Sequence, residues 1–194
     1  DLTESIVRTL RESGERSITI APETGSDRLR RVVNKTVTND EIRDRADTIH
    51  ELEEILDDAW RSGGCVLIPA FAVGRTQELL YWFAKHWDDW KMSRWQIFLD
   101  SPMASKVVDV YGRHQNLFDD DAKRVWNNHP NPFKLPNLHI TESVDESMAI
   151  NRIEGGAIII AGSGMANGGR ILHHLRYNLG RRGAHVVFVG YQAV

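Results

Sequence analysis

The stretch "GAIIIAGSGMANGGRILHHL", residues 156–175, constrains the fold most, because an apolar run leads through a glycine-rich turn into an amphipathic pattern. Residues 157–161 show no polar alternation, which is typical of a strand covered on both faces. After the turn, Ile171, Leu172 and Leu175 recur at helical spacing. The turn therefore joins a buried strand to a helix, the unit from which α/β folds are built.

The same succession of strand and helix recurs along the chain. We expect neighbouring parallel strands at residues 64–71, 96–100, 156–162 and 185–190, with a further strand near 138–140. The amphipathic pattern up to Trp60 predicts a helix that begins near Thr38 or Asn39, and Ser101-Pro102 predicts another helix start. Strands that alternate with helices imply an α/β fold with a mostly parallel sheet and flanking helices.

The glycine-rich turn is a candidate anion site. It contains Gly162, Gly164, Gly168 and Gly169. Ligands of open α/β sheets lie beyond the carboxyl ends of strands, where the amides of a helix N-terminus favour an anion. Ser163 adds a hydroxyl donor, and Arg170 adds a planar cation suited to phosphate. The spacing matches neither the dinucleotide-binding G-x-G-x-x-G nor a Walker A loop, so phosphate binding and a purely structural turn both stay open.

Two other predicted strands end in informative residues. Gly74 breaks the first strand, and Arg75 stands at a helix start, where a cation opposes the helix dipole. Such an arginine is either held for a ligand or a carboxylate, or solvated. Ser101 as a helix N-cap followed by proline explains the next strand end without any function. Asp100, at the tip of that strand, is therefore the more informative residue.

Composition narrows the function classes. The chain has 194 residues, 41% of them hydrophobic, and a net charge of −3, so any polyanion would bind at a local patch rather than in a global basic field. The single cysteine, Cys65, excludes a disulfide framework and a cysteine-based zinc cluster. No apolar run is long enough to span a membrane and no signal peptide opens the chain, so we expect a cytoplasmic protein without a membrane partner. The start at Asp1 suggests a fragment of a longer protein.

Four segments together resemble the β-CASP domain of metallo-β-lactamase-fold RNA-processing nucleases. They are "VLIPAFAVGRTQELLY", "IFLDSPMASKVVDVY", "IIIAGSGMANGGRILHHL" and "HVVFVGYQA", and the resemblance covers residues 44–194. It implies a Rossmann-like β-CASP fold, truncated here, that caps a metallo-β-lactamase domain and clamps RNA in the cleft between them. The residues that we expect to bind phosphate or RNA are Arg75, Asp100, Ser101, Ser163, Gly164, Met165, Gly168, Gly169 and Arg170.

The family's zinc ligands have no counterpart in this sequence. Its H-x-H-x-D-H motif is absent, and the eight histidines are scattered. The resemblance therefore implies zinc in the full-length parent, where metal-bound hydroxide would hydrolyse RNA phosphodiesters, and no zinc bound by this chain. The partners that it implies are RNA and the lactamase domain, and we add a homodimer as an expectation. This chain alone is predicted to be inactive.

Residues 1–43 do not fit that family. The segment "SITIAPETGSDRLRRVVNKTVTNDEI" resembles part of a radical S-adenosylmethionine enzyme, although Cys65 alone cannot hold an iron–sulfur cluster. We expect a chimeric junction near residues 43–47 and a foreign, poorly packed N-terminal segment; the alternative is an unusual N-terminal extension of a β-CASP protein. For the whole chain, the alternatives are a radical S-adenosylmethionine enzyme fragment and a non-catalytic α/β nucleotide- or RNA-binding module.

Overall fold

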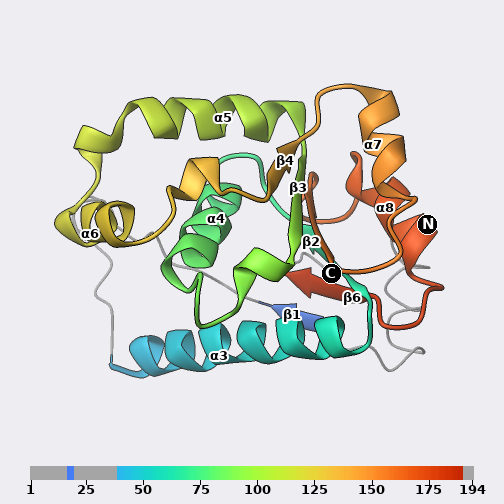
Figure 1. The fold of residues 1–194 in the computed structure, drawn as a ribbon, viewed down its shortest axis with the longest axis horizontal. Coiled ribbons are helices and arrows are strands. Elements are labelled where there is room, and N and C mark those ends of the chain that lie inside the picture. Colours follow the sequence, from blue (N-terminus) through green and yellow to red (C-terminus); the bar gives the residue numbers. More distant parts are fainter. Residues whose placement is uncertain (1–16, 20–38, 190–194) are drawn as a thin grey trace.

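The strands form one parallel sheet. The computed structural model describes residues 17–19 and 39–189, with side chains from residue 49 onward. Six strands lie in the order β1-β6-β2-β5-β3-β4, and all neighbours run parallel (Figure 1). Their bounds are β1 Ser17–Thr19, β2 Cys65–Pro69, β3 Gln96–Asp100, β4 Leu138–Ile140, β5 Ala157–Ala161 and β6 His185–Phe188.

Helices connect these strands. The α-helices of the described residues are α3 Asn39–Arg61, α4 Arg75–Lys85, α5 Pro102–Arg113, α6 Asp120–Asn128, α7 Val144–Ile150 and α8 Ile171–Asn178. Three short 3₁₀ turns, η1 Met92–Arg94, η2 Gln115–Leu117 and η3 Pro132–Lys134, lie in the connections. No helix of this part of the chain combines the length and the apolar character that crossing a membrane would require.

Helices cover both faces of the sheet, and the central strands β2 and β5 are apolar and buried at every position. Along β2, Val66 and Ile68 join the core cluster that contains residues of α3, α4 and α5. Leu67 points to the opposite face and packs in a cluster with Ile171 and Leu175 of α8. Helix α7 covers the same face as α8, further along the sheet, through Ile150 (Figure 1). The result is a three-layer α/β arrangement.

The predicted fold class is confirmed. The four strands that we expected side by side are β6, β2, β5 and β3, in that spatial order, and the expected strand at 138–140 is β4. Ser101 caps α5 as predicted, since its Oγ accepts a hydrogen bond from the Ala104 amide at 3.3 Å. Helix α7 was not predicted from the sequence.

The predictions for residues 1–43 fall almost entirely outside the described residues. Here the structure describes only β1, which pairs with β6 at one edge of the sheet, and the first turn of α3. The proposed junction near residues 43–47 therefore stays a prediction.

Candidate functional site

Four strand ends meet at one edge of the sheet. Because β2, β5, β3 and β4 are parallel neighbours, the segments that follow them converge at their carboxyl ends, where ligands of open α/β sheets bind. The register places Pro69 and Asp100 level with Ala161 on either side of it. A pocket of about 390 Å³ opens there, lined by residues 70–72, 100–103 and 162–164, with Gly169 and Arg170.

Asp100 lies at the base of this edge and is fully buried. Its carboxylate accepts four hydrogen bonds, from Thr141 Oγ1 (2.5 Å), Ser147 Oγ (2.5 Å), Arg170 Nη1 (2.6 Å) and His174 Nε2 (2.6 Å). Burial alone would raise the pKa of Asp100, but these hydrogen bonds outweigh it and hold the pKa of this carboxyl well below its usual range. Asp100 is therefore a buried anion with every oxygen occupied.

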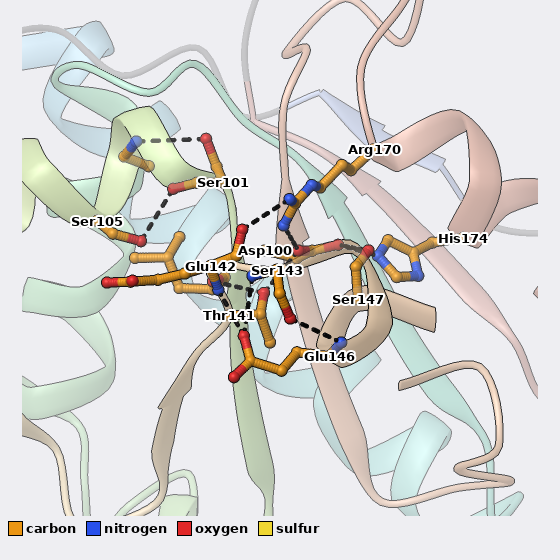
Figure 2. Close-up of polar contacts among 12 residues, drawn as sticks. Asp100, Ser101, Ser105, Thr141, Glu142, Ser143, Glu146, Ser147, Arg170 and His174 are labelled. Carbon is orange, nitrogen blue, oxygen red and sulfur yellow. Dashed lines mark hydrogen bonds and ion pairs between the residues drawn. The ribbon is translucent and has the colours of Figure 1, made fainter. Parts of the chain in front are cut away.

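The four donors reach Asp100 from three separate segments, as Figure 2 shows. Thr141 directly follows β4, the neighbour of β3. Ser147 lies one turn into α7, which begins at a capping box in which Ser143 accepts from the Glu146 amide and Glu146 accepts from the Ser143 amide. His174 lies on α8, fully buried, with its other ring nitrogen 3.1 Å from Asn151 Oδ1. The network thus ties β3, β4, α7 and α8 together.

Arg170 links this network to the pocket. Its Nη1 donates to Asp100 and its Nη2 donates to the Glu142 carbonyl at 2.9 Å (Figure 2). These bonds use two of the five N–H groups of a guanidinium, and the partly exposed side chain lines the pocket. The buried carboxylate therefore fixes the orientation of a cation that still has donors to offer a ligand.

The glycine loop, residues 162–170, folds back on itself beside Arg170. The Ser163 amide donates to the Gly168 carbonyl, the Ile171 amide donates to the Gly162 carbonyl, and Ser163 Oγ donates to Asn167 Oδ1 at 2.7 Å. Gly169 has φ +74°, and a Cβ there would lie 2.3 Å from the Gly162 carbonyl oxygen. Only glycine fits at this position. The convergence of the loop amides on one anion stays a prediction.

The predicted site residues do not all meet at the pocket. Six line it: Asp100, Ser101, Ser163, Gly164, Gly169 and Arg170. Met165, Gly168 and Arg75 do not. Arg75 begins α4 and pairs with Glu78 at 2.9 Å, so its cation is held by a carboxylate, one of the two roles that the sequence left open. Burial lowers the pKa of Arg75, and the negative charge of Glu78 opposes that shift.

Sequence reasoning missed several residues of the site. Thr141, Ser147 and His174 were not predicted to meet Asp100, and Phe71 and Met103 were not predicted to line the pocket. The sequence Ser143-x-x-Glu146 is a capping-box signal that could have identified α7 and hence the position of Ser147. Nothing local to the sequence marks which histidine of the His173–His174 pair is buried.

The described residues do not fit a zinc site. Among them, no group of three or more histidine, cysteine, aspartate or glutamate side chains is close enough to hold a metal ion. Cys65 is buried and free. The described site instead consists of hydrogen-bond donors, Arg170 among them, around the Asp100 carboxylate.

A parallel sheet with a pocket at the carboxyl ends of its central strands places the chain among the Rossmann-like α/β domains. The Beta-Casp domain family matches residues 76–194, well over half of the chain. The chain belongs to this family, as the sequence segments predicted. The match begins inside α4, so it does not bear on residues 1–43, and the resemblance of that segment to a radical S-adenosylmethionine enzyme stays a prediction.

Named relatives agree with the family match. The chain is 42% identical to Ribonuclease TTHA0252 of Thermus thermophilus over 75% of this chain and 33% of that protein. It is 31% identical to Transcription termination factor FttA of a Lokiarchaeum species over 79% of this chain and 24% of that protein. It is 27% identical to Endoribonuclease YSH1 of Kluyveromyces lactis over 61% and 16%. The chain spans a third or less of the length of these relatives.

Proposed function

We propose that this chain is the RNA-binding Beta-Casp part of a zinc-dependent ribonuclease with a metallo-β-lactamase-fold catalytic domain. The family membership and the names of two relatives, a ribonuclease and an endoribonuclease, support RNA as the ligand. No cluster of zinc ligands occurs among the described residues, so the zinc site would belong to residues outside them. Cleavage would then need the catalytic domain as a partner. The proposal also includes a cytoplasmic location and a homodimer.

Arg170 carries the proposal. Its guanidinium is oriented by Asp100 and the Glu142 carbonyl and lines the pocket beside the glycine loop. Among the described residues, no further hydrogen bond engages its other three N–H groups. A planar cation with fixed orientation is suited to a phosphate oxygen. In this arrangement Arg170 binds the RNA backbone and Asp100 positions it, because a fully buried carboxylate cannot itself contact the ligand.

Replacing Arg170 by alanine tests this assignment. Charge-assisted hydrogen bonds contribute about 1.5–3 kcal/mol each, so RNA affinity should fall about ten- to a hundredfold. Loss of one phosphate contact should also reduce the salt dependence of single-strand binding by about 0.7 in log–log slope. Fluorescence anisotropy of a labelled RNA oligomer at several salt concentrations measures both.

Arg113→Ala is the matched control. Arg113 is an exposed arginine in the last turn of α5 that pairs with Asp109, so this variant also removes one positive charge. It should bind RNA as the wild type does. Equal binding by Arg170→Ala, with its fold confirmed by circular dichroism, would show that the loop is only a structural turn.

A further inference from the structure

Phe71 exposes its ring without a role in the core. The residue is 44% exposed and belongs to none of the core clusters that the described residues form. The backbone of Phe71 forms the hydrogen bonds at this position: its carbonyl accepts from Thr76 Oγ1 at 2.8 Å and from the Thr76 amide at 3.3 Å. These hydrogen bonds explain the backbone conformation at residue 71 but do not require an aromatic side chain there.

The ring lies directly against the glycine loop. A Cβ built on Gly164 would lie 2.6 Å from Cδ2 of the Phe71 ring. Such a distance is far inside van der Waals contact, so the ring occupies the space that a side chain at residue 164 would need. One side of the ring is thus fixed against the loop backbone, while much of the rest remains accessible from the pocket.

The pocket offers a second apolar side chain and a single cation. Met103, in the first turn of α5, is 65% exposed and lines the pocket with Phe71. Arg170 is the one cation among the described residues that line the pocket, and Asp100 already holds part of its guanidinium. The volume of about 390 Å³ lies within the range of about 300–1,000 Å³ that small-molecule pockets show.

This combination selects a ligand with a flat apolar part and an anionic part. We propose that the pocket takes one nucleotide of single-stranded RNA, with its base against the Phe71 ring and Met103 and its phosphate at Arg170. The proposal rests on the RNA-binding function proposed above and adds the nucleotide subsite. Every base has a π face that can stack on an aromatic ring, so the subsite tolerates any sequence. It requires an unpaired base, because bases of a duplex are already stacked within the helix.

Phe71→Leu tests the subsite because it keeps the apolar side chain and the backbone contacts but removes the π face. In fluorescence anisotropy with the 194-residue chain, a labelled oligouridine should bind this variant about five- to a hundredfold more weakly, the range that base–aromatic stacking supports. Phe71→Trp should bind at least as tightly as the wild type. The salt dependence of binding should not change in either variant, because no charge is removed.

Two further probes separate the subsite from a general effect on the loop. An abasic RNA backbone and a duplex RNA should bind Phe71→Leu as they bind the wild type, since neither places a base on the ring. Met103→Ala should likewise weaken the binding of oligouridine and leave the binding of the abasic backbone and of the duplex unchanged. Equal weakening for the abasic backbone would show that the ring only supports the loop, and oligouridine affinity unchanged by Phe71→Leu would also overturn the subsite.

The outcomes distinguish this inference from the proposed function. If Arg170→Ala weakens oligouridine binding and Phe71→Leu does not, the result supports the phosphate contact and refutes the base subsite. If the wild-type chain binds no RNA at low salt, both fall. Thermal unfolding of each variant measures whether it is folded at the assay temperature, which separates a change in affinity from loss of the fold.

Discussion

Replacing Asp100 by asparagine tests whether one buried carboxylate organises this edge of the sheet. Oδ1 accepts from Thr141 and Arg170, and Oδ2 accepts from Ser147 and His174. Asparagine has the same shape but presents one oxygen and one NH₂ group, so the two groups that donate to one carboxylate oxygen would lose their acceptor, and the negative charge would be lost as well. Because a hydrogen bond to a charged group contributes about 1.5–3 kcal/mol, the variant should lose about 3–6 kcal/mol of unfolding free energy.

This loss is large compared with the stability of a typical domain. Removal of one partner of a buried ion pair costs about 3–5 kcal/mol, out of a total of about 5–15 kcal/mol. Urea unfolding at neutral pH, followed by tryptophan fluorescence, measures the difference. Asp109→Asn is the matched control: Asp109 is an exposed α5 carboxylate paired with Arg113, and its loss should cost about 0.5 kcal/mol or less. A similarly small loss for Asp100→Asn would refute the organising role.

The pH dependence gives an independent check of the same reasoning. The pKa of Asp100 is lowered in the folded chain, so its ionised form stabilises the fold above its unfolded pKa of about 3.9. That contribution is lost as the pH falls through the folded pKa. The difference between wild type and Asp100→Asn should therefore be constant near neutral pH and shrink below about pH 4. A difference that stays constant in acid would show that the charge of Asp100 is not what matters.

Two further substitutions test local features of the site. Gly169→Ala would place a Cβ 2.3 Å from the Gly162 carbonyl oxygen at a φ of +74°, so it should lower the free energy of unfolding by about 1–3 kcal/mol or more, as measured by urea unfolding; wild-type stability would show that the loop has room to relax. Ser143→Ala removes the N-cap of α7 and should cost about 1 kcal/mol in the same assay, whereas Ser163→Ala, which caps no helix, serves as its comparison and should cost less.

The strands were predictable because the sheet is buried on both faces. A strand covered by helices on each side is apolar along most of its length, and β2 and β5 follow directly from such runs. Strand β3 has a shorter apolar run, residues 97–99, between the exposed Gln96 and the buried Asp100. The observed strand ends differ from the predicted ones: the strand expected at residues 64–71 spans Cys65–Pro69, because the chain turns away toward α4 at Ala70. Helix α7 was missed because it has only two turns, too few for a clear helical period.

The site was predictable only in part, for a geometric reason. The carboxyl ends of neighbouring parallel strands must share an edge, so Asp100 and the glycine loop could be expected to lie close together. The identity of the groups that meet Asp100 depends on non-local packing. Thr141 arrives because β4 pairs with β3, and His174 arrives because α8 covers one face of the sheet. Neither contact has a signal in the local sequence.

If Arg170 binds RNA as proposed, the net charge of the chain explains why an oriented arginine would contribute more than a basic surface. At −3, the chain has no general field that would attract a polyanion. Asp100 also offsets much of the charge of Arg170, so the attraction at the pocket cannot come from net charge alone. The remaining contribution is the orientation of the guanidinium, which Asp100 and the Glu142 carbonyl hold in one plane. Because the side chain is already ordered, a ligand that binds its N–H groups loses less conformational entropy. Affinity at such a site depends on the buried residues that hold the arginine as much as on the arginine itself.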